Sequence, residues 1–132
     1  MLDASDIYGV VFKNGSATLL ARVVGADGAP VTPGQIASAA YTVAILDEHD
    51  PDSATPVAGH QGVSVSVAEL VSDTLQQDAL WDVDELGYNF KHVLDVSAQP
   101  AFPTAGRQYR IQFELTPAAG QVILVRFRVH AI

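Results

Sequence analysis

Four histidines are the side chains in this chain best suited to metal binding or acid–base chemistry. They are His49, His60, His92 and His130, and they are widely separated along the sequence. A zinc site needs three or four converging ligands, often at close sequence spacing. The wide separation gives no support for such a site, and we expect the protein to hold no metal or other cofactor.

A run of acidic residues is the second group with chemical potential. Asp47, Glu48, Asp50 and Asp52 lie in one stretch, and calcium takes six to eight oxygen ligands. However, Pro51 interrupts the pattern, and no glycine and downstream glutamate complete an EF-hand loop. We interpret the stretch as a solvated loop, with a calcium loop as the alternative. A weaker acidic cluster consists of Asp82, Asp84 and Glu85.

Motifs for covalent catalysis and phosphate binding are missing from the sequence. No Gly-x-Ser-x-Gly elbow occurs, and the segment from Gly25 to Gly28 lacks the lysine of a phosphate-binding loop. The chain has no cysteine, which excludes thiolate catalysis and disulfides. Paired carboxylates for glycoside hydrolysis need a cleft that the sequence does not indicate. We therefore expect a protein that is not an enzyme.

The composition is typical of one folded domain over residues 1–132. Of its residues 48% are hydrophobic and 17% are charged, with a formal net charge of −8. The acidity disfavours nucleic-acid binding, which draws on a basic surface, and no apolar run is long enough to span a membrane. The N-terminus lacks the features of a secretory signal. We expect a chain made without a signal peptide that is cytoplasmic or assembled into a virus particle.

Alternation of apolar and polar residues predicts about seven strands that position these side chains. Ser66 and Glu69 have the spacing of a capping box, and Leu70 and Leu75 follow at roughly helical spacing. This pattern predicts one short helix or irregular crossover near residues 67–80. The predicted strands span residues 7–12, 17–24, 39–46, 63–67, 87–96, 109–116 and 121–131.

His92 falls inside one of these strands, within residues 87–96. It shares the parity of Tyr88, Phe90 and Leu94, which predicts that it points toward the core. We expect a histidine at the edge of the core with one hydrogen-bonded nitrogen, since buried polar atoms generally find a partner. A functional role for His92 is the alternative.

The C-terminal pair of strands gives the clearest pattern. A loop ending in a left-handed Gly120 would place the even-numbered residues of both strands on one face. The outward face then combines Arg110, Leu124, Arg126 and Arg128, a mixture typical of protein contact surfaces. An ordinary solvated face is the alternative. The residues predicted to form core are Tyr109, Ile111, Phe113, Val125, Phe127 and Val129.

The segment from Pro103 to Tyr109, followed by a strand, a hairpin and a last strand, resembles the end of immunoglobulin-like domains. Tyr109 lies where these domains often carry a tyrosine, and Ile111 lies where antibody domains have their second cysteine. The chain lacks the cysteine pair, and Trp81 is not on the third strand. The resemblance is thus to the broad architecture, and it implies an antiparallel β-sandwich.

A second resemblance concerns the short turn Gly-Ala-Asp-Gly-Ala-Pro-Val and the late strand Ala-Gly-Arg-Gln-Tyr-Arg-Ile. Together with the terminal hairpin they are similar to small β-sandwich modules of phage tails, baseplates and other virion proteins. This resemblance implies a non-enzymatic structural or assembly module that acts through a protein partner or as a homo-oligomer. The alternative is a carbohydrate- or small-ligand-binding β-sandwich that uses Trp81, Tyr88 and the loop at residues 47–52.

Overall fold

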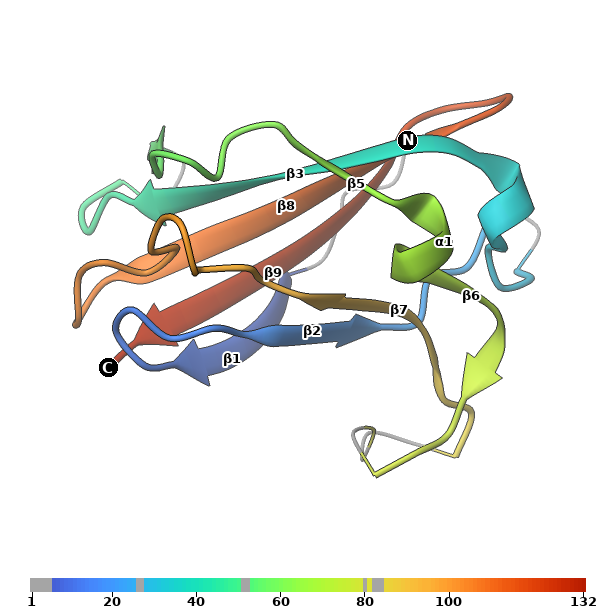
Figure 1. Cartoon of the computed structure of the whole chain (residues 1–132), viewed down its shortest axis with the longest axis horizontal. Coiled ribbons are helices and arrows are strands. Elements are labelled where there is room, and N and C mark those ends of the chain that lie inside the picture. Colours follow the sequence, from blue (N-terminus) through green and yellow to red (C-terminus); the bar gives the residue numbers. More distant parts are fainter. Residues whose placement is uncertain (1–5, 26–27, 51–52, 80, 82–84) are drawn as a thin grey trace.

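Two packed β-sheets make up the computed structural model, which describes residues 6–25, 28–50, 53–79, 81 and 85–132 (Figure 1). The larger sheet has the strand order β1-β9-β8-β3-β4, and β5 also pairs with β3. The smaller sheet has the order β2-β7-β6. This arrangement confirms the prediction of a mainly β, sandwich-like fold. The larger sheet contains β1 (Asp6–Val11), β3 (Ile36–Leu46), β4 (Ala54–Pro56), β5 (Val63–Val65), β8 (Gln108–Pro117) and β9 (Ile123–Ala131). The smaller sheet contains β2 (Thr18–Ala21), β6 (Val71–Gln76) and β7 (Tyr88–Val93).

The β8–β9 hairpin forms with the predicted parity. Its register pairs Arg110 with Arg128 and Gln112 with Arg126, so the even-numbered residues share one face. Gly120 adopts the expected positive φ of 105°. The last pair joins Leu115 to Ile123, however, so the connection is longer than the predicted loop. All six residues predicted to form core are buried.

Strand β1 departs from the expected antiparallel pattern. It pairs in parallel with β9, from Asp6 opposite Arg126 to Val11 opposite Ala131. The predicted turn at Asn14-Gly15 does form, with Asn14 at a φ of 60°. It joins β1 to β2 across the sandwich, because these two strands belong to different sheets.

The segment predicted as a helix or crossover is part helix and part strand. Helix α1 (Val67–Leu70) covers only its first turn, and β6 follows directly at Val71. Leu70 and Val71 are both buried, so the helical spacing of the leucines reflects a short turn that enters a strand. Among the described residues, the other helical element is the 3-10 turn η1 (Pro33–Gln35). In the described part of the chain, no helix has the length and apolarity needed to cross a membrane.

Tyr109 fixes the entry to β8 through its hydroxyl group. The Tyr109 hydroxyl accepts a hydrogen bond from the Thr104 amide at 2.9 Å and donates one to the Thr104 carbonyl at 3.3 Å. The ring is fully buried and packs edge-to-face on Phe102, with centroids 5.3 Å apart. These contacts give Tyr109 a structural role, because a buried tyrosine needs a partner for its hydroxyl.

Asn89 is buried although its parity on β7 predicts the polar face. Its Oδ1 accepts a hydrogen bond from the Val23 amide at 2.7 Å. Its Nδ2 donates to the carbonyls of Val23 and Val31, both at 2.9 Å. One side chain thus satisfies three backbone groups of the segment that leads from β2 toward η1, and the segment covers this face of β7.

We predict that Asn89→Ala lowers the free energy of unfolding by about 2–4 kcal/mol, because it removes three hydrogen bonds and leaves the buried Val23 amide and Val31 carbonyl without this partner, while the Val23 carbonyl keeps the Val31 amide. Asn89→Asp should also destabilise, since a carboxylate cannot donate to the two carbonyls. Urea-induced unfolding measures both effects, with Lys91→Ala on the same strand as the control. A loss in Asn89→Ala no larger than in Lys91→Ala would contradict the prediction.

Candidate functional site

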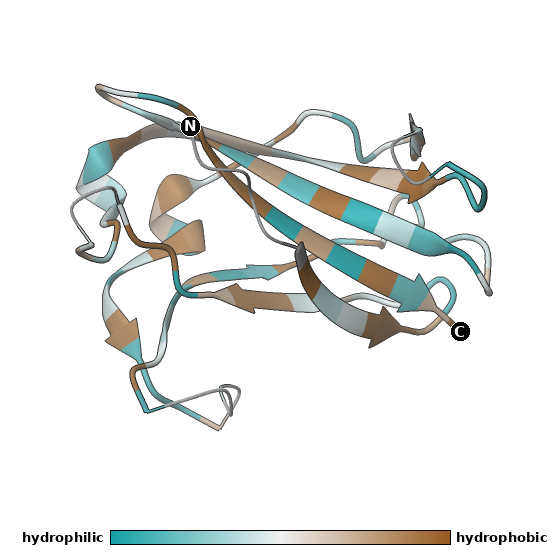
Figure 2. Cartoon of the chain, turned by 180° about the vertical axis from the view of Figure 1, so that it is seen from behind, coloured by the Kyte–Doolittle hydropathy of each residue, from teal (hydrophilic) through white to brown (hydrophobic). Residues whose placement is uncertain are grey.

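The four predicted interface residues come together on the outer face of the larger sheet. We call Arg110, Leu124, Arg126 and Arg128 the arginine face. Arg110 and Arg128 lie directly opposite each other in the β8–β9 register, and Arg126 lies two residues before Arg128. All four side chains are partly exposed. Figure 2 views this sheet from its outer side, where hydrophilic and hydrophobic residues alternate along β8 and β9.

Neutral glutamines orient two of these arginines. The Arg126 Nε–H donates to Gln112 Oε1 at 2.8 Å, and the Arg128 Nε–H donates to Gln108 Oε1 at 2.8 Å. A glutamine holds a guanidinium in position without cancelling its charge. Within the described residues, neither Arg110 nor Arg126 forms an ion pair with a carboxylate. Three of the seven basic residues of an acidic chain are therefore concentrated on one face.

Strand β1 extends the arginine face with exposed apolar residues that the sequence did not assign to it. Tyr8 is paired with Arg128, and Val10 is paired with His130. Tyr8 is 73% exposed and Val10 is 65% exposed. No local sequence pattern predicts this extension, because β1 and β9 lie at opposite ends of the chain and pair only in the folded protein.

Leu20 and Val24 have the outward parity on the second predicted strand, but they do not join this surface. Leu20 lies on β2 in the smaller sheet, and Val24 follows that strand. Leu20 is partly buried beside a groove, and Val24 is exposed. The exposed apolar residues beside the arginine face are therefore Tyr8 and Val10, and not Leu20 and Val24.

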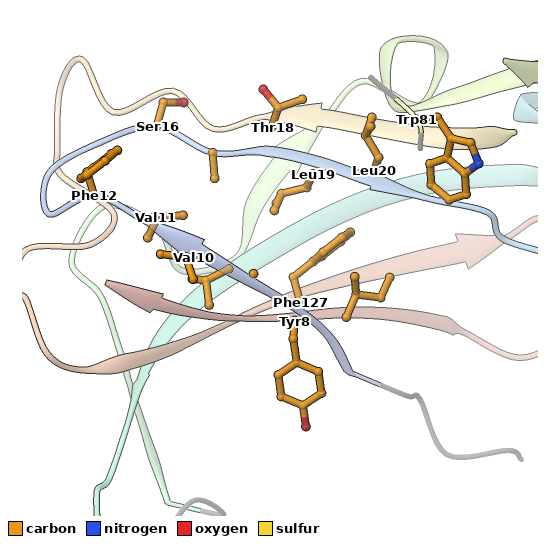
Figure 3. Close-up of a pocket in the computed structure, with 14 residues that line it drawn as sticks. Tyr8, Val10, Val11, Phe12, Ser16, Thr18, Leu19, Leu20, Trp81 and Phe127 are labelled. Carbon is orange, nitrogen blue, oxygen red and sulfur yellow. The ribbon is translucent and has the colours of Figure 1, made fainter. Parts of the chain in front are cut away.

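The groove lies between β1 and β2, at the open edge of the sandwich, and has a volume of about 380 Å³. Figure 3 shows Phe12 and Trp81 toward its opposite ends, while Tyr8 points away from β2. Gly9 leaves space in its wall, since an added Cβ would meet only a Val129 methyl at 3.7 Å. Most of its lining is apolar side chain from β1, β2 and β9.

The two aromatic residues proposed for ligand contact differ in accessibility. Trp81 is partly buried and packs against Tyr88, with ring centroids 5.8 Å apart. Tyr88 is buried, and its hydroxyl donates to Asp78 Oδ2 at 2.6 Å, which raises the pKa of the phenol. The buried Tyr88 ring thus packs against Trp81, and of these two residues only Trp81 borders the groove.

The histidine with hydrogen-bonded ring nitrogens is His60. Its Nε2 donates to the Gln99 carbonyl at 2.9 Å, and its Nδ1 shares a hydrogen bond with the Tyr41 hydroxyl, also at 2.9 Å. Burial is the main cause that raises the pKa of Tyr41, which is the opposite of what an activated nucleophile requires. The arrangement fits a structural link between β3 and the loops beside it.

His92 does point inward as predicted, and its ring lies 5.3 Å from the rings of both Tyr41 and Phe113. Burial lowers the pKa of His92, and the nearby Glu69 carboxylate acts in the opposite direction. Among the described residues its ring has no hydrogen-bond partner, so the expected hydrogen-bonded nitrogen is found on His60 instead.

Hydrogen bonds within the acidic loop stabilise a turn at Asp47. Asp47 Oδ1 accepts hydrogen bonds from the amides of His49 and Asp50, at 2.8 and 3.0 Å. Glu48 lies 3.4 Å from the Nε of Arg107. No group of three or more histidine, aspartate or glutamate side chains suited to a metal is found in the part of the chain that the structure describes. Asp52, Asp82 and Asp84 lie outside the described residues.

Comparison of this chain with known proteins does not assign it to a family. No family model matches it, and neither the curated proteins nor the solved structures give a significant match.

We predict that His92→Leu makes folding stability less sensitive to acid. Because burial disfavours the charged imidazole of His92, the unfolded chain takes up this proton first as the pH falls below the ordinary histidine value of about 6.5. As the pH falls, the wild-type protein should therefore lose more unfolding free energy than His92→Leu. The difference between the two should be smaller than about 1.4 kcal/mol per pH unit, which is the limit for the uptake of one proton.

Urea unfolding between about pH 7.5 and 5.5 measures this difference across the ordinary histidine range. His130→Leu is the matched control, because His130 is exposed on β9. Equal pH slopes for the wild type and His92→Leu would show that His92 is not a source of acid sensitivity.

Proposed function

We propose that this chain is a non-enzymatic assembly module that binds a protein partner through its arginine face. The proposed scaffold is an immunoglobulin-like sandwich. In that architecture the second, fifth and fourth strands face the seventh, sixth and third. The strand orders β2-β7-β6 and β9-β8-β3 support this correspondence. The hydroxyl contacts of Tyr109 also support it, since such domains tie a tyrosine at this point to the preceding backbone.

The observation that carries the proposal is the set of three arginines on one face of a chain with a net charge of −8. Like charges directly opposite each other on a sheet are destabilising, and Arg110 faces Arg128. An acidic partner would bring carboxylates to these closely spaced guanidinium groups. Guanidinium groups form paired hydrogen bonds with carboxylates, and arginine is enriched in protein interfaces.

A protein partner fits this surface better than a nucleic acid. Tyr8, Val10 and Leu124 place apolar area beside the arginines, as in a protein interface. Nucleic-acid binding gains from many basic contacts along a backbone, whereas the whole chain carries seven basic residues against fifteen acidic ones. The resemblance to virion modules stays a prediction, and the proposal does not depend on it.

We predict that an oligoglutamate peptide binds the arginine face and that Arg110→Gln/Arg126→Gln weakens this binding by at least about tenfold, because two charge-assisted contacts are lost. An NMR titration of the labelled protein measures both affinity and location. The shifted amides should lie on β8, β9 and β1, and the affinity should fall as salt is added.

Lys91→Gln is the matched control, since Lys91 lies on β7 in the other sheet. Equal binding by the double variant and Lys91→Gln would refute the role of the arginine face. Tighter binding of single-stranded DNA than of oligoglutamate, at the same residues, would refute the choice of a protein partner.

The groove favours a second candidate function, the binding of a small apolar ligand. Its volume of about 380 Å³ lies in the range of ligand sites, which are typically about 300–1,000 Å³ and mostly apolar. Trp81, the single tryptophan of the chain, borders it. The apolar lining favours an apolar ligand over a carbohydrate, which would need more polar groups.

For this second function, we predict that anilinonaphthalene sulfonate changes Trp81 fluorescence and that Gly9→Leu abolishes the change. A leucine at position 9 would fill the space that Gly9 leaves beside Val129. Gly34→Ala is the control, because an added Cβ there meets no atom within 4 Å. An unchanged response in Gly9→Leu would show that the groove is not the binding site.

A further inference from the structure

Strand β1 ends the larger sheet with a side that no described strand covers. Among the described residues its only partner strand is β9. An uncovered strand edge presents unpaired amide and carbonyl groups that can pair with another chain. The outer edge of β1 is therefore a surface distinct from the arginine face, although Tyr8 and Val10 border both.

The other edge strands of the molecule have features that discourage pairing. β4 and β5 have three residues each, and β4 ends at Pro56. β2 has four residues. β6 carries Asp73, and its register with β7 is shifted. Short length, proline, charge and irregular register are the devices by which proteins protect edges.

β1 has none of these protective features beyond its first residue. Residues 7–12 contain no charge and no proline, and the β1–β9 register has no shift. Tyr8 and Val10 project from it with exposed fractions of 73% and 65%, and Phe12, just beyond the strand, is 73% exposed. Figure 2 colours this edge as predominantly hydrophobic. A long, uncharged and apolar edge is the type that pairs with another strand.

We propose that β1 pairs antiparallel with β1 of a second copy of this chain and so forms a symmetric dimer with one continuous sheet. A symmetric interface requires a surface that complements itself, and β1, which has no charged residue after Asp6, meets this requirement on a chain with a net charge of −8. Over residues 7–12 two such chains can approach without juxtaposing carboxylates.

The spacing along β1 suits a twofold axis at Gly9. In that register Tyr8 of each copy lies opposite Val10 of the other, which forms two aromatic–aliphatic pairs across the axis. Gly9 has no side chain to obstruct the crossing. Ile7 points toward the groove and is 40% exposed, so a strand added at this edge would also cover part of the groove mouth.

Sedimentation equilibrium of the full chain tests the dimer. The wild type should show a monomer–dimer equilibrium, and Tyr8→Lys/Val10→Lys should weaken association by at least about tenfold, because lysines then face each other. Tyr8→Glu/Val10→Glu should do the same. An equimolar mixture of the two variants should regain the dimer, because each lysine then faces a glutamate.

Two controls separate this interface from other surfaces. Val93→Lys alters a valine that is 53% exposed on β7 and should leave the dimer intact. Arg110→Gln/Arg126→Gln should also leave it intact. Thermal unfolding by circular dichroism establishes that each variant is folded, and Val10→Lys alone serves if a double variant is not.

Any one of the following results would overturn the proposal. The first is a wild-type protein that stays monomeric up to about 1 mM, where even a weak dimer would be populated. The second is a lysine variant that dimerises as strongly as the wild type. The third is a lysine–glutamate mixture that remains monomeric, or a dimer that Val93→Lys or the arginine variant dissociates equally.

Discussion

The inward side chains of β8 impose the packing constraint on which the rest of the molecule depends. Tyr109, Ile111, Phe113 and Leu115 have no solvent exposure, and β8 pairs with β9 on one side and β3 on the other. Alternation then forces the even-numbered residues outward. A shift of one residue in register would bury Arg110 and Glu114 and expose the aromatic rings. The position of the arginine face is thus a consequence of core burial on the opposite side of the same strand.

The sequence predicts the strands whose alternation of apolar and polar residues lies within the strand itself, and it fails where burial depends on distant segments. The alternation in β8 and β9 has a period of two over long runs, so these strands and their faces were predictable. β6 was not, because a single turn of helix precedes it and the leucine spacing is that of a helix. The parity of Asn89 predicted a side chain on the polar face. That prediction was wrong, because the burial of Asn89 depends on a loop some sixty residues earlier in the chain.

The candidate surfaces divide in the same way. The arginine face followed from parity within one hairpin, and the structure brings its four members together. Tyr8 and Val10 join it only because the first strand lies beside the last, which no local pattern encodes. The burial of His60 could not be predicted from the sequence either. Its partners are Tyr41 on β3 and the carbonyl of Gln99, so its burial comes from distant segments that converge beside the sheet.

The distribution of charge connects the two proposed surfaces. The same sheet has a basic outer face and an uncharged edge, on a chain whose net charge is −8. Tyr8 stands where they meet, opposite Arg128 in the β1–β9 register. Pairing through the β1 edge would place two arginine faces side by side on one continuous sheet. Each copy of an acidic partner would then have a second site close by, and linked sites bind more tightly than single ones without any new contact.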